Sequence, residues 1–123
     1  MNPVAWFEIY VQDLERARLF YETVLGITLS ELNSPIEGMK MLAFPAGQDK
    51  YGATGALVRM EGAPKGTGGT LVYFSCKDCA VEAARAADAG GTLVKGKFSI
   101  APFGAIAMVT DTEGNMVGLH SME

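Results

Sequence analysis

Three side chains of this 123-residue chain could carry acid–base chemistry. His120, the only histidine, exchanges a proton near neutral pH, and Glu8 and Tyr73 could act as a base and an acid. We take these three as candidate catalytic residues. Each also has a structural reading. His120 could be a solvated side chain, and Glu8 could form an ion pair with Arg59.

Other side chains could hold a ligand without reacting. Trp6 could stack on a flat molecule or only fill space, and Arg59 could anchor an anion. Phe98 and Phe103 flank a short segment with a proline and could form a rim or pack internally. The sequence has no G-x-S-x-G motif, and neither cysteine has a nearby histidine, so no nucleophile constellation is indicated.

The elements that must position these residues follow one pattern twice. Residues 6–11 alternate as a strand does, Asp13 then caps a helix, and Gly26 ends it. In the second half, a strand at 71–76 precedes a helix that Asp78 caps and that Gly90 and Gly91 end. The strands expected after the two helices are Ile27–Leu32, Met39–Phe44 and Ala53–Met60, then Thr92–Ile100, Gly104–Thr110 and Met116–Ser121, with a hairpin turn at 111–115.

The two halves match at an offset of 65 residues, which pairs Asp13 with Asp78 and Gly26 with Gly91 and predicts helices of equal length. We therefore predict an α+β fold of two tandem βαβββ modules with mixed sheets, one domain over residues 1–123, with module one at about 1–61 and module two at about 69–123. The Gly-rich residues 61–69 would link them. Each module has a helix on one face of its sheet. The two bare faces would then enclose a cup with the helices outside, within one chain or across a homodimer.

Strand alternation assigns side chains to the cup. Trp6, Glu8 and Tyr10 share one face of the first strand, opposite the apolar Phe7 and Ile9. The remaining residues expected to face the cup are Leu57 and Arg59 with Gly55, then Leu71, Tyr73 and Ser75, and finally Gly118 and His120.

Composition narrows the function classes. Apolar residues make up 49% of the chain, the net charge is −4, and the ten Lys and Arg form no basic cluster, so nucleic-acid binding is not indicated. No signal peptide or membrane span is visible, and we expect a cytoplasmic protein. The Cys76-x-x-Cys79 pair lacks partners for a redox or zinc site and is interpreted as a core thiol on the strand at 71–76 with an incidental second thiol.

The run V-x-D-x6-F-Y-x4-G, from Val11 through Asp13, Phe20 and Tyr21 to Gly26, resembles the opening module of the vicinal oxygen chelate superfamily. The turn at 111–115 resembles the closing hairpin of that superfamily, which includes glyoxalase I, extradiol dioxygenases, epimerases and bleomycin-resistance proteins. The resemblance implies paired βαβββ modules. In metal-dependent members, it also implies a divalent ion held by His and Glu from the first and last strand of each module. Among members, the chain most resembles the glyoxalase-like proteins.

At the positions where the resemblance implies metal ligands, this sequence has Trp6, Leu71, Gly118 and, with a less certain alignment, Gly55. None of these side chains offers an oxygen or nitrogen lone pair to an ion. We therefore expect no cofactor and no family-type metal site. The first hypothesis is that the cup binds a small organic molecule, either as a binding module or as a metal-independent enzyme. The alternatives are a metal-dependent lyase or isomerase of the glyoxalase I type, a non-catalytic drug-binding protein of the bleomycin-resistance type, and an interaction protein with a filled cup.

Overall fold

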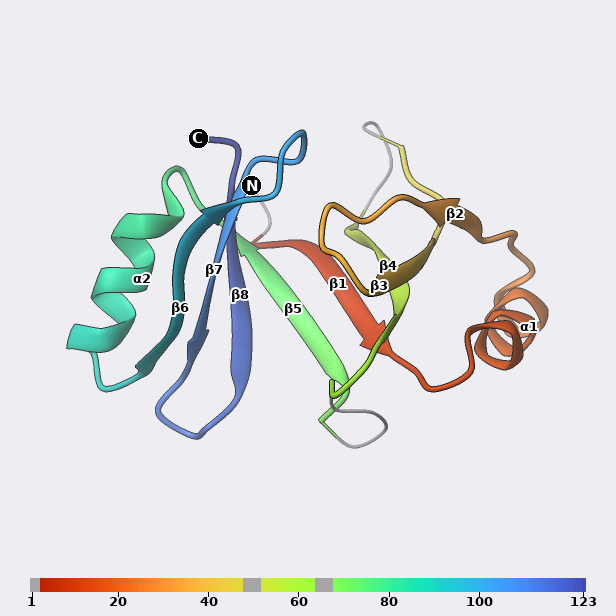
Figure 1. The fold of residues 1–123 in the computed structure, drawn as a ribbon, viewed down its shortest axis with the longest axis horizontal. Coiled ribbons are helices and arrows are strands. Elements are labelled where there is room, and N and C mark those ends of the chain that lie inside the picture. Colours follow the sequence, from red (N-terminus) through yellow and green to blue (C-terminus); the bar gives the residue numbers. More distant parts are fainter. Residues whose placement is uncertain (1–2, 48–51, 64–67) are drawn as a thin grey trace. The chain divides into compact units, whose positions relative to one another are not determined.

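The computed structural model describes residues 3–47, 52–63 and 68–123, and it has the predicted α+β architecture of two βαβββ modules (Figure 1). Residues 64–67 of the expected linker lie outside the described residues. None of the described helices combines the length and the apolar character that crossing a bilayer requires.

Module one consists of a strand, a helix and three further strands. Its elements are β1 (Val4–Tyr10), α1 (Leu14–Leu25), β2 (Ser30–Leu32), β3 (Met39–Ala43) and β4 (Thr54–Met60). The strands lie in the order β2-β3-β4-β1, with β1 and β4 parallel and the other pairs antiparallel. The one clear departure from expectation is β2, which is only three residues long.

Module two repeats this topology. Its elements are β5 (Thr70–Ser75), α2 (Cys79–Asp88), β6 (Thr92–Ser99), β7 (Ala105–Thr110) and β8 (Met116–Ser121). Here the order is β5-β8-β7-β6, again with a parallel first pair and antiparallel pairs after it. The internal repeat inferred from the sequence is therefore a repeat of topology.

The helix boundaries follow from capping. Asp13 accepts a hydrogen bond from the backbone N–H of Arg16, and Gly26 closes α1 in the left-handed region at φ 65°. Asp78 accepts from the N–H of Ala80 and so begins α2. The expected equal length is wrong: α1 has 12 residues and α2 has 10, because α2 already ends at Asp88.

Each module has its own core between its helix and its sheet. In module one, the buried residues are Leu29, Leu42, Phe44 and Leu57. Leu14, Ala17 and Tyr21 of α1 pack against them. The core of module two is built from small residues. It contains Cys79 and Ala83 of α2 with Ala105, Ala107, Val109 and Leu119 of the sheet.

The strand β6 is the outer strand of module two. All but one of its eight residues are exposed, and its pairing with β7 shifts register twice, between Leu93 and Lys95 and between Lys95 and Phe98. Lys97 of β6 forms an ion pair with Asp78, the cap of α2, at 2.8 Å. The helix and the outer strand are thus joined by one charged contact.

The contacts divide the chain into two compact units. Residues 6–70 form one unit and residues from Leu71 onward form the other. The residues before Trp6 belong to the second unit, where the carbonyl of Pro3 accepts a hydrogen bond from the N–H of Ser75 at 2.8 Å. The predicted cup shared by the modules stays a prediction.

Candidate functional site

The sheet of module one has two faces of different character. One carries Phe7 and Ile9 of β1 and packs with Leu57 under α1. The other has no helix on it, and we call it the open face. Its residues are Trp6, Glu8 and Tyr10 of β1, Leu32 of β2, Met39 and Met41 of β3, and Ala56, Val58 and Met60 of β4.

A carboxylate lies at the centre of this open face. Glu8 is only 5% exposed. Its Oε2 accepts a hydrogen bond from Nε1 of Trp6 at 3.1 Å, and its Oε1 accepts one from the hydroxyl of Tyr10 at 2.7 Å. A buried carboxylate is stable only with such partners. One acidic side chain therefore fixes the orientation of an indole and a phenol on the same strand.

Methionines share this face. Met41, Ala56 and Val58 form a buried cluster on it, and Trp6, Tyr10, Met39 and Met60, all half-buried, pack against that cluster. Thioether side chains adapt their shape and contact aromatic rings favourably. The sequence reasoning did not select these methionines, although Met39 and Met41 alternate along β3 in the way that residues on one face must.

Two residues expected beside Glu8 lie on the opposite side of the sheet. Leu57 is fully buried in the core beneath α1, so it cannot reach a ligand on the open face. Arg59, two residues after Leu57 in the same strand, lies on the same side of the sheet as Leu57. The Nε of Arg59 donates to the carbonyl of Gln12 at 3.0 Å. Both expected orientations are wrong. The register also pairs Glu8 with Ala56, as it pairs Tyr73 with Gly118. Ala56, not Gly55, is therefore the counterpart of Gly118.

The positions where the family's metal enzymes hold ligands do not fit a metal ion. They are Trp6 and Ala56 in module one and Leu71 and Gly118 in module two, and none has a side-chain donor atom. At Gly118 the space is also taken. A β-carbon there would lie 2.3 Å from Cδ2 of Tyr73. Among the described residues, no group of three or more His, Cys, Asp and Glu gathers as a metal site would require.

In module two the expected face assignment is confirmed. Phe74 packs toward α2, whereas Tyr73 lies against Gly118 on the helix-free side. Ser75 is paired with His120, and Leu71 and Tyr73 are 8% and 7% exposed. Tyr73 and Ser75 therefore flank the candidate base His120.

A hydrogen bond of His120 indicates which of its ring nitrogens carries the hydrogen. Nε2 lies 2.5 Å from the carbonyl oxygen of Phe103. A carbonyl oxygen only accepts, so Nε2 carries a hydrogen and donates it. In the neutral ring the basic atom is then Nδ1. Phe103 itself is 41% exposed, and Phe98 lies under the ammonium of Lys95 at 4.1 Å.

The two cysteines take different positions from those expected. Cys79, the first residue of α2, is fully buried, whereas Cys76 is only partly buried, and both are free thiols. Burial, and after it the nearby Glu82 carboxylate, raises the pKa of the Cys76 thiol. The fully buried core thiol is thus the helical one, and the protonated form of Cys76 is favoured at neutral pH.

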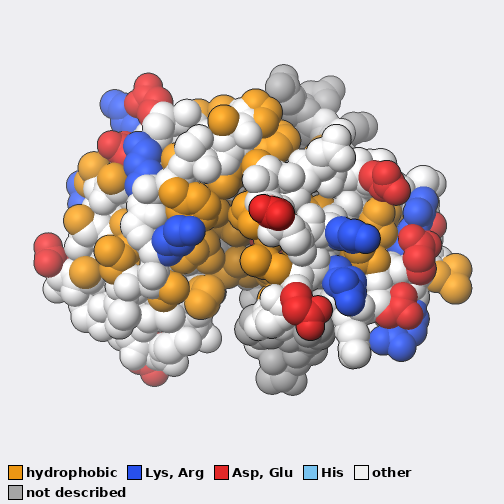
Figure 2. All heavy atoms as spheres, in the orientation of Figure 1, with side chains coloured by type: hydrophobic (Ala, Val, Ile, Leu, Met, Phe, Trp, Pro, Cys, Tyr) orange, Lys and Arg blue, Asp and Glu red, His pale blue; other side chains and the backbone are white. Residues whose placement is uncertain are grey.

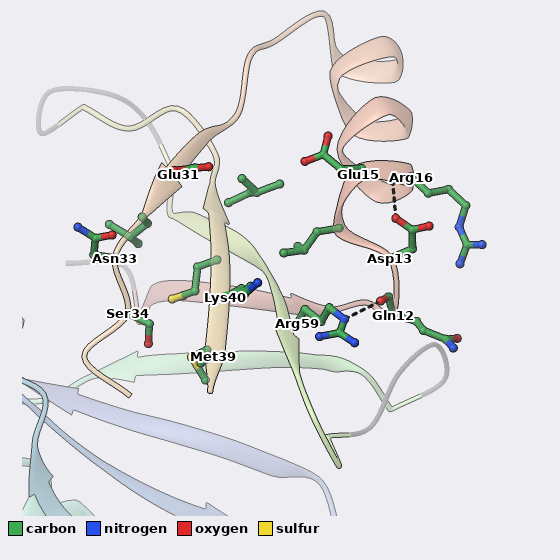
Figure 3. A pocket seen from close by; sticks show the side chains of 14 residues that line it. Gln12, Asp13, Glu15, Arg16, Glu31, Asn33, Ser34, Met39, Lys40 and Arg59 are labelled. Carbon is green, nitrogen blue, oxygen red and sulfur yellow. Dashed lines mark hydrogen bonds between the residues drawn. The ribbon is translucent and has the colours of Figure 1, made fainter. Parts of the chain in front are cut away.

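A polar pocket lies beside the start of α1, on the side of the sheet that Arg59 faces (Figure 3). Its volume is about 1220 Å³. Residues that line it come from the Gln12–Arg16 segment, from β2 and the residues after it, and from β3 and β4, with Lys40 and Arg59 among them. Figure 2 shows acidic and basic side chains interspersed over the visible surface rather than gathered by sign.

Comparisons with known proteins agree with this architecture. Residues 4–42 match the family model of the bleomycin resistance protein-like N-terminal region. The comparison with curated proteins found no similar sequence.

Solved structures match over nearly the whole chain. Methylmalonyl-CoA epimerase from Mycobacterium tuberculosis is 18% identical, with a TM-score of 0.71 over 98% of this chain and 88% of that one. The Streptomyces coelicolor epimerase is 17% identical, with a TM-score of 0.68 over 98% and 94%. A hypothetical protein from Bacillus halodurans is 13% identical, with a TM-score of 0.73 over 98% and 94%.

The paired βαβββ modules define the class as that of the vicinal oxygen chelate fold. At these identities the structural likeness shows the fold alone. The family match extends over residues 4–42 alone, and there the chain is similar to the bleomycin resistance protein-like N-terminal region.

Proposed function

We propose that this protein binds a small, flat organic molecule on the open face of module one without the family's metal ion. The observation that carries the proposal is the Glu8 carboxylate, which is 5% exposed and accepts hydrogen bonds from Trp6 and Tyr10. Burying a charged group on an apolar, methionine-lined face costs desolvation free energy. A functional role explains the presence of such a group more readily than a contribution to stability does.

The shape of the ligand follows from the side chains that remain accessible. Trp6 and Tyr10 are half-buried, and Glu8 restrains both rings. Restrained aromatic groups bind planar molecules at a small entropic cost. Met39 and Met60, which lie on the same face, would adapt to the outline of the ligand.

The charge of the ligand follows from Glu8. An aromatic cation would be attracted to this carboxylate and to the face of the Trp6 indole. An aromatic anion of the same size would be repelled. The overall charge of −4 acts in the same direction. We therefore expect the order of affinity cation, neutral molecule, anion.

Trp6 supplies a direct test because it is the only tryptophan. Its indole N–H gives one side-chain signal in a proton–nitrogen NMR spectrum, and that N–H is the group bonded to Glu8. Uniformly labelled protein would be titrated with N-methylquinolinium, quinoline and naphthalene-2-carboxylate. Saturable movement of this signal, in the expected order, supports the proposal. If none of the three probes moves it, the proposal is wrong.

Matched variants locate the binding. Met60→Ala should weaken N-methylquinolinium binding by roughly tenfold, since a buried methionine contact is worth about 1–3 kcal/mol. Met122→Ala is the control, because Met122 is 68% exposed and lies on module two. Equal affinities in the two variants would contradict the location.

Two further measurements separate the alternative functions. Elemental analysis of the purified protein tests the metal-dependent glyoxalase-type lyase or isomerase, and a stoichiometric divalent metal would overturn the metal-free proposal. Titration with metal-free bleomycin tests the drug-binding alternative, which the family match over residues 4–42 supports. Tight binding of bleomycin at the Trp6 signal would narrow the ligand class to that drug type.

A further inference from the structure

Two cations lie side by side on the helix-covered side of the module-one sheet. Lys40 of β3 and Arg59 of β4 are direct partners in the antiparallel register. Like charges in this position repel each other and lower the stability of the sheet. Such a pair becomes favourable when an anion lies between the two groups.

The guanidinium of Arg59 is already oriented. Its Nε donates to the backbone carbonyl of Gln12 at 3.0 Å. This bond uses one of the five N–H groups of an arginine and leaves the others for a ligand, and Figure 3 shows the guanidinium beside Gln12 among the residues that line the pocket. The fork that binds carboxylates and phosphates is thereby presented in a fixed geometry.

Among the residues that the structure describes, no carboxylate forms an ion pair with Lys40 or Arg59. Within the ranges that the structure describes, the ion pairs are Arg18 with Glu15 and Glu22, and Lys97 with Asp78. Three acids and Arg16 also line the pocket. Of these acids, Asp13 caps α1 and Glu15 lies 3.9 Å from Arg18. Both keep their negative charge and, together with Glu31, oppose an anion in the pocket.

We propose that Lys40 and Arg59 form a second binding site, which takes the carboxylate or phosphate group of a small molecule in the pocket between the start of α1 and strands β3 and β4. The pocket, at about 1220 Å³, is large enough for such a molecule. Lys40 and Arg59 face away from Glu8, although Leu32, Met39 and Met41 of the open face also line the pocket.

Isothermal titration calorimetry at low ionic strength tests the site with three probes: inorganic phosphate, pyrophosphate and malonate. We expect saturable binding of at least one probe, weakened by added NaCl because exposed charges are screened. Stronger binding of pyrophosphate would identify a phosphate ligand, and stronger binding of malonate would identify a carboxylate ligand.

Variants assign the binding to the pair. Lys40→Gln and Arg59→Gln should each weaken binding roughly tenfold, as the loss of one charge-assisted hydrogen bond does. Glu31→Gln should strengthen it. Lys77→Gln and Arg85→Gln in module two remove the same charges and should leave the affinity unchanged.

Stability gives a second readout. Without the anion, Lys40→Gln should melt at a higher temperature than the parent protein, because the repulsion is relieved. The same anion concentration should raise the melting temperature of the parent more than that of the variant, because the variant binds more weakly. The proposal fails if no probe binds saturably, or if Lys40→Gln and Arg59→Gln bind like the two controls. The Trp6 signal should not move in these titrations, which separates failure here from failure at the open face.

Discussion

Replacing Gly118 by alanine tests how tightly Tyr73 packs on the helix-free face of module two. A β-carbon at position 118 would lie 2.3 Å from Cδ2, 2.4 Å from Cε2 and 2.8 Å from Cγ of the Tyr73 ring. Carbon atoms in contact are separated by about 3.5–4.0 Å, so the ring must retreat by roughly 1 Å or more.

Two effects of opposite sign decide the size of the change. Alanine restricts the unfolded chain more than glycine does, which stabilises by about 0.4–1 kcal/mol. Overpacking a dense site costs about 1–3 kcal/mol. Tyr73 is only 7% exposed and has little room to move, so the second effect should win. We expect a net loss of about 1–2 kcal/mol, or a melting temperature lower by roughly 3–10 °C.

Gly96→Ala is the matched control. Gly96 lies in β6, its φ is not in the left-handed region, and an added β-carbon meets nothing within 4 Å. It should melt at or slightly above the parent temperature. Urea unfolding of all three proteins, followed by circular dichroism, gives the free energies. The reasoning is refuted if Gly118→Ala is as stable as Gly96→Ala while the Tyr73 ring keeps its NMR shifts.

Three further predictions concern a cap, a thiol and a turn. Asp13→Ala should lower the free energy of unfolding by about 1 kcal/mol, because the N–H of Arg16 loses its acceptor. Asp13→Asn should retain most of the parent stability. Equal losses for the two variants in urea unfolding would contradict the capping role. Cys76 should react slowly with iodoacetamide at neutral pH, since burial and, after it, the Glu82 carboxylate raise the pKa of its thiol. Glu82→Gln should accelerate this reaction, as measured by mass spectrometry. An unchanged rate would argue against an effect of Glu82 on the thiol. Hydrogen bonds from the amide groups of its turn hold the pKa of Asp111 below its usual range. The contribution of Asp111 to the free energy of unfolding is therefore full above about pH 4 and is lost as the pH falls through the lowered pKa. The difference in stability between the parent and Asp111→Ala should shrink on acidification, and a constant difference would disprove this role of Asp111.

The sequence was sufficient for the fold where local signals agree. Asp13 and Gly26 mark the ends of α1 because capping and the left-handed conformation are local properties of those residues. The β8 strand, Met116–Ser121, has the expected bounds because the preceding turn is defined by Asp111, which accepts from the N–H groups of Glu113 and Asn115.

The direction of side chains in β4 could not be read in the same way. Gly55, Ala56, Leu57 and Val58 are all buried, so this strand has apolar residues on both faces and no alternation to read. The faces of this strand were then taken from the uncertain alignment of the ligand position with Gly55, whereas the register makes Ala56 the counterpart of Gly118. Arg59 was placed with Glu8 for this reason.

The site itself was predicted in part. The alternation of Trp6, Glu8 and Tyr10 is clear along β1, and their hydrogen bonds confirm a shared face. The methionines of this face come from two strands, Met39 and Met41 from β3 and Met60 from β4, and only the sheet order brings these strands beside β1. The predicted homodimer, the cytoplasmic location and the catalytic roles of Glu8, Tyr73 and His120 stay predictions.

The outer strand of module two affects how the protein behaves at high concentration. An unpaired strand edge is a template on which further chains can add and grow into fibres. Here Lys95 places a positive charge along that edge, whereas Lys97 is paired with Asp78, and the two register shifts break the regular spacing of the strand. Incoming strands would meet repulsion and mismatched hydrogen-bonding groups. This edge can therefore remain bare without seeding aggregation.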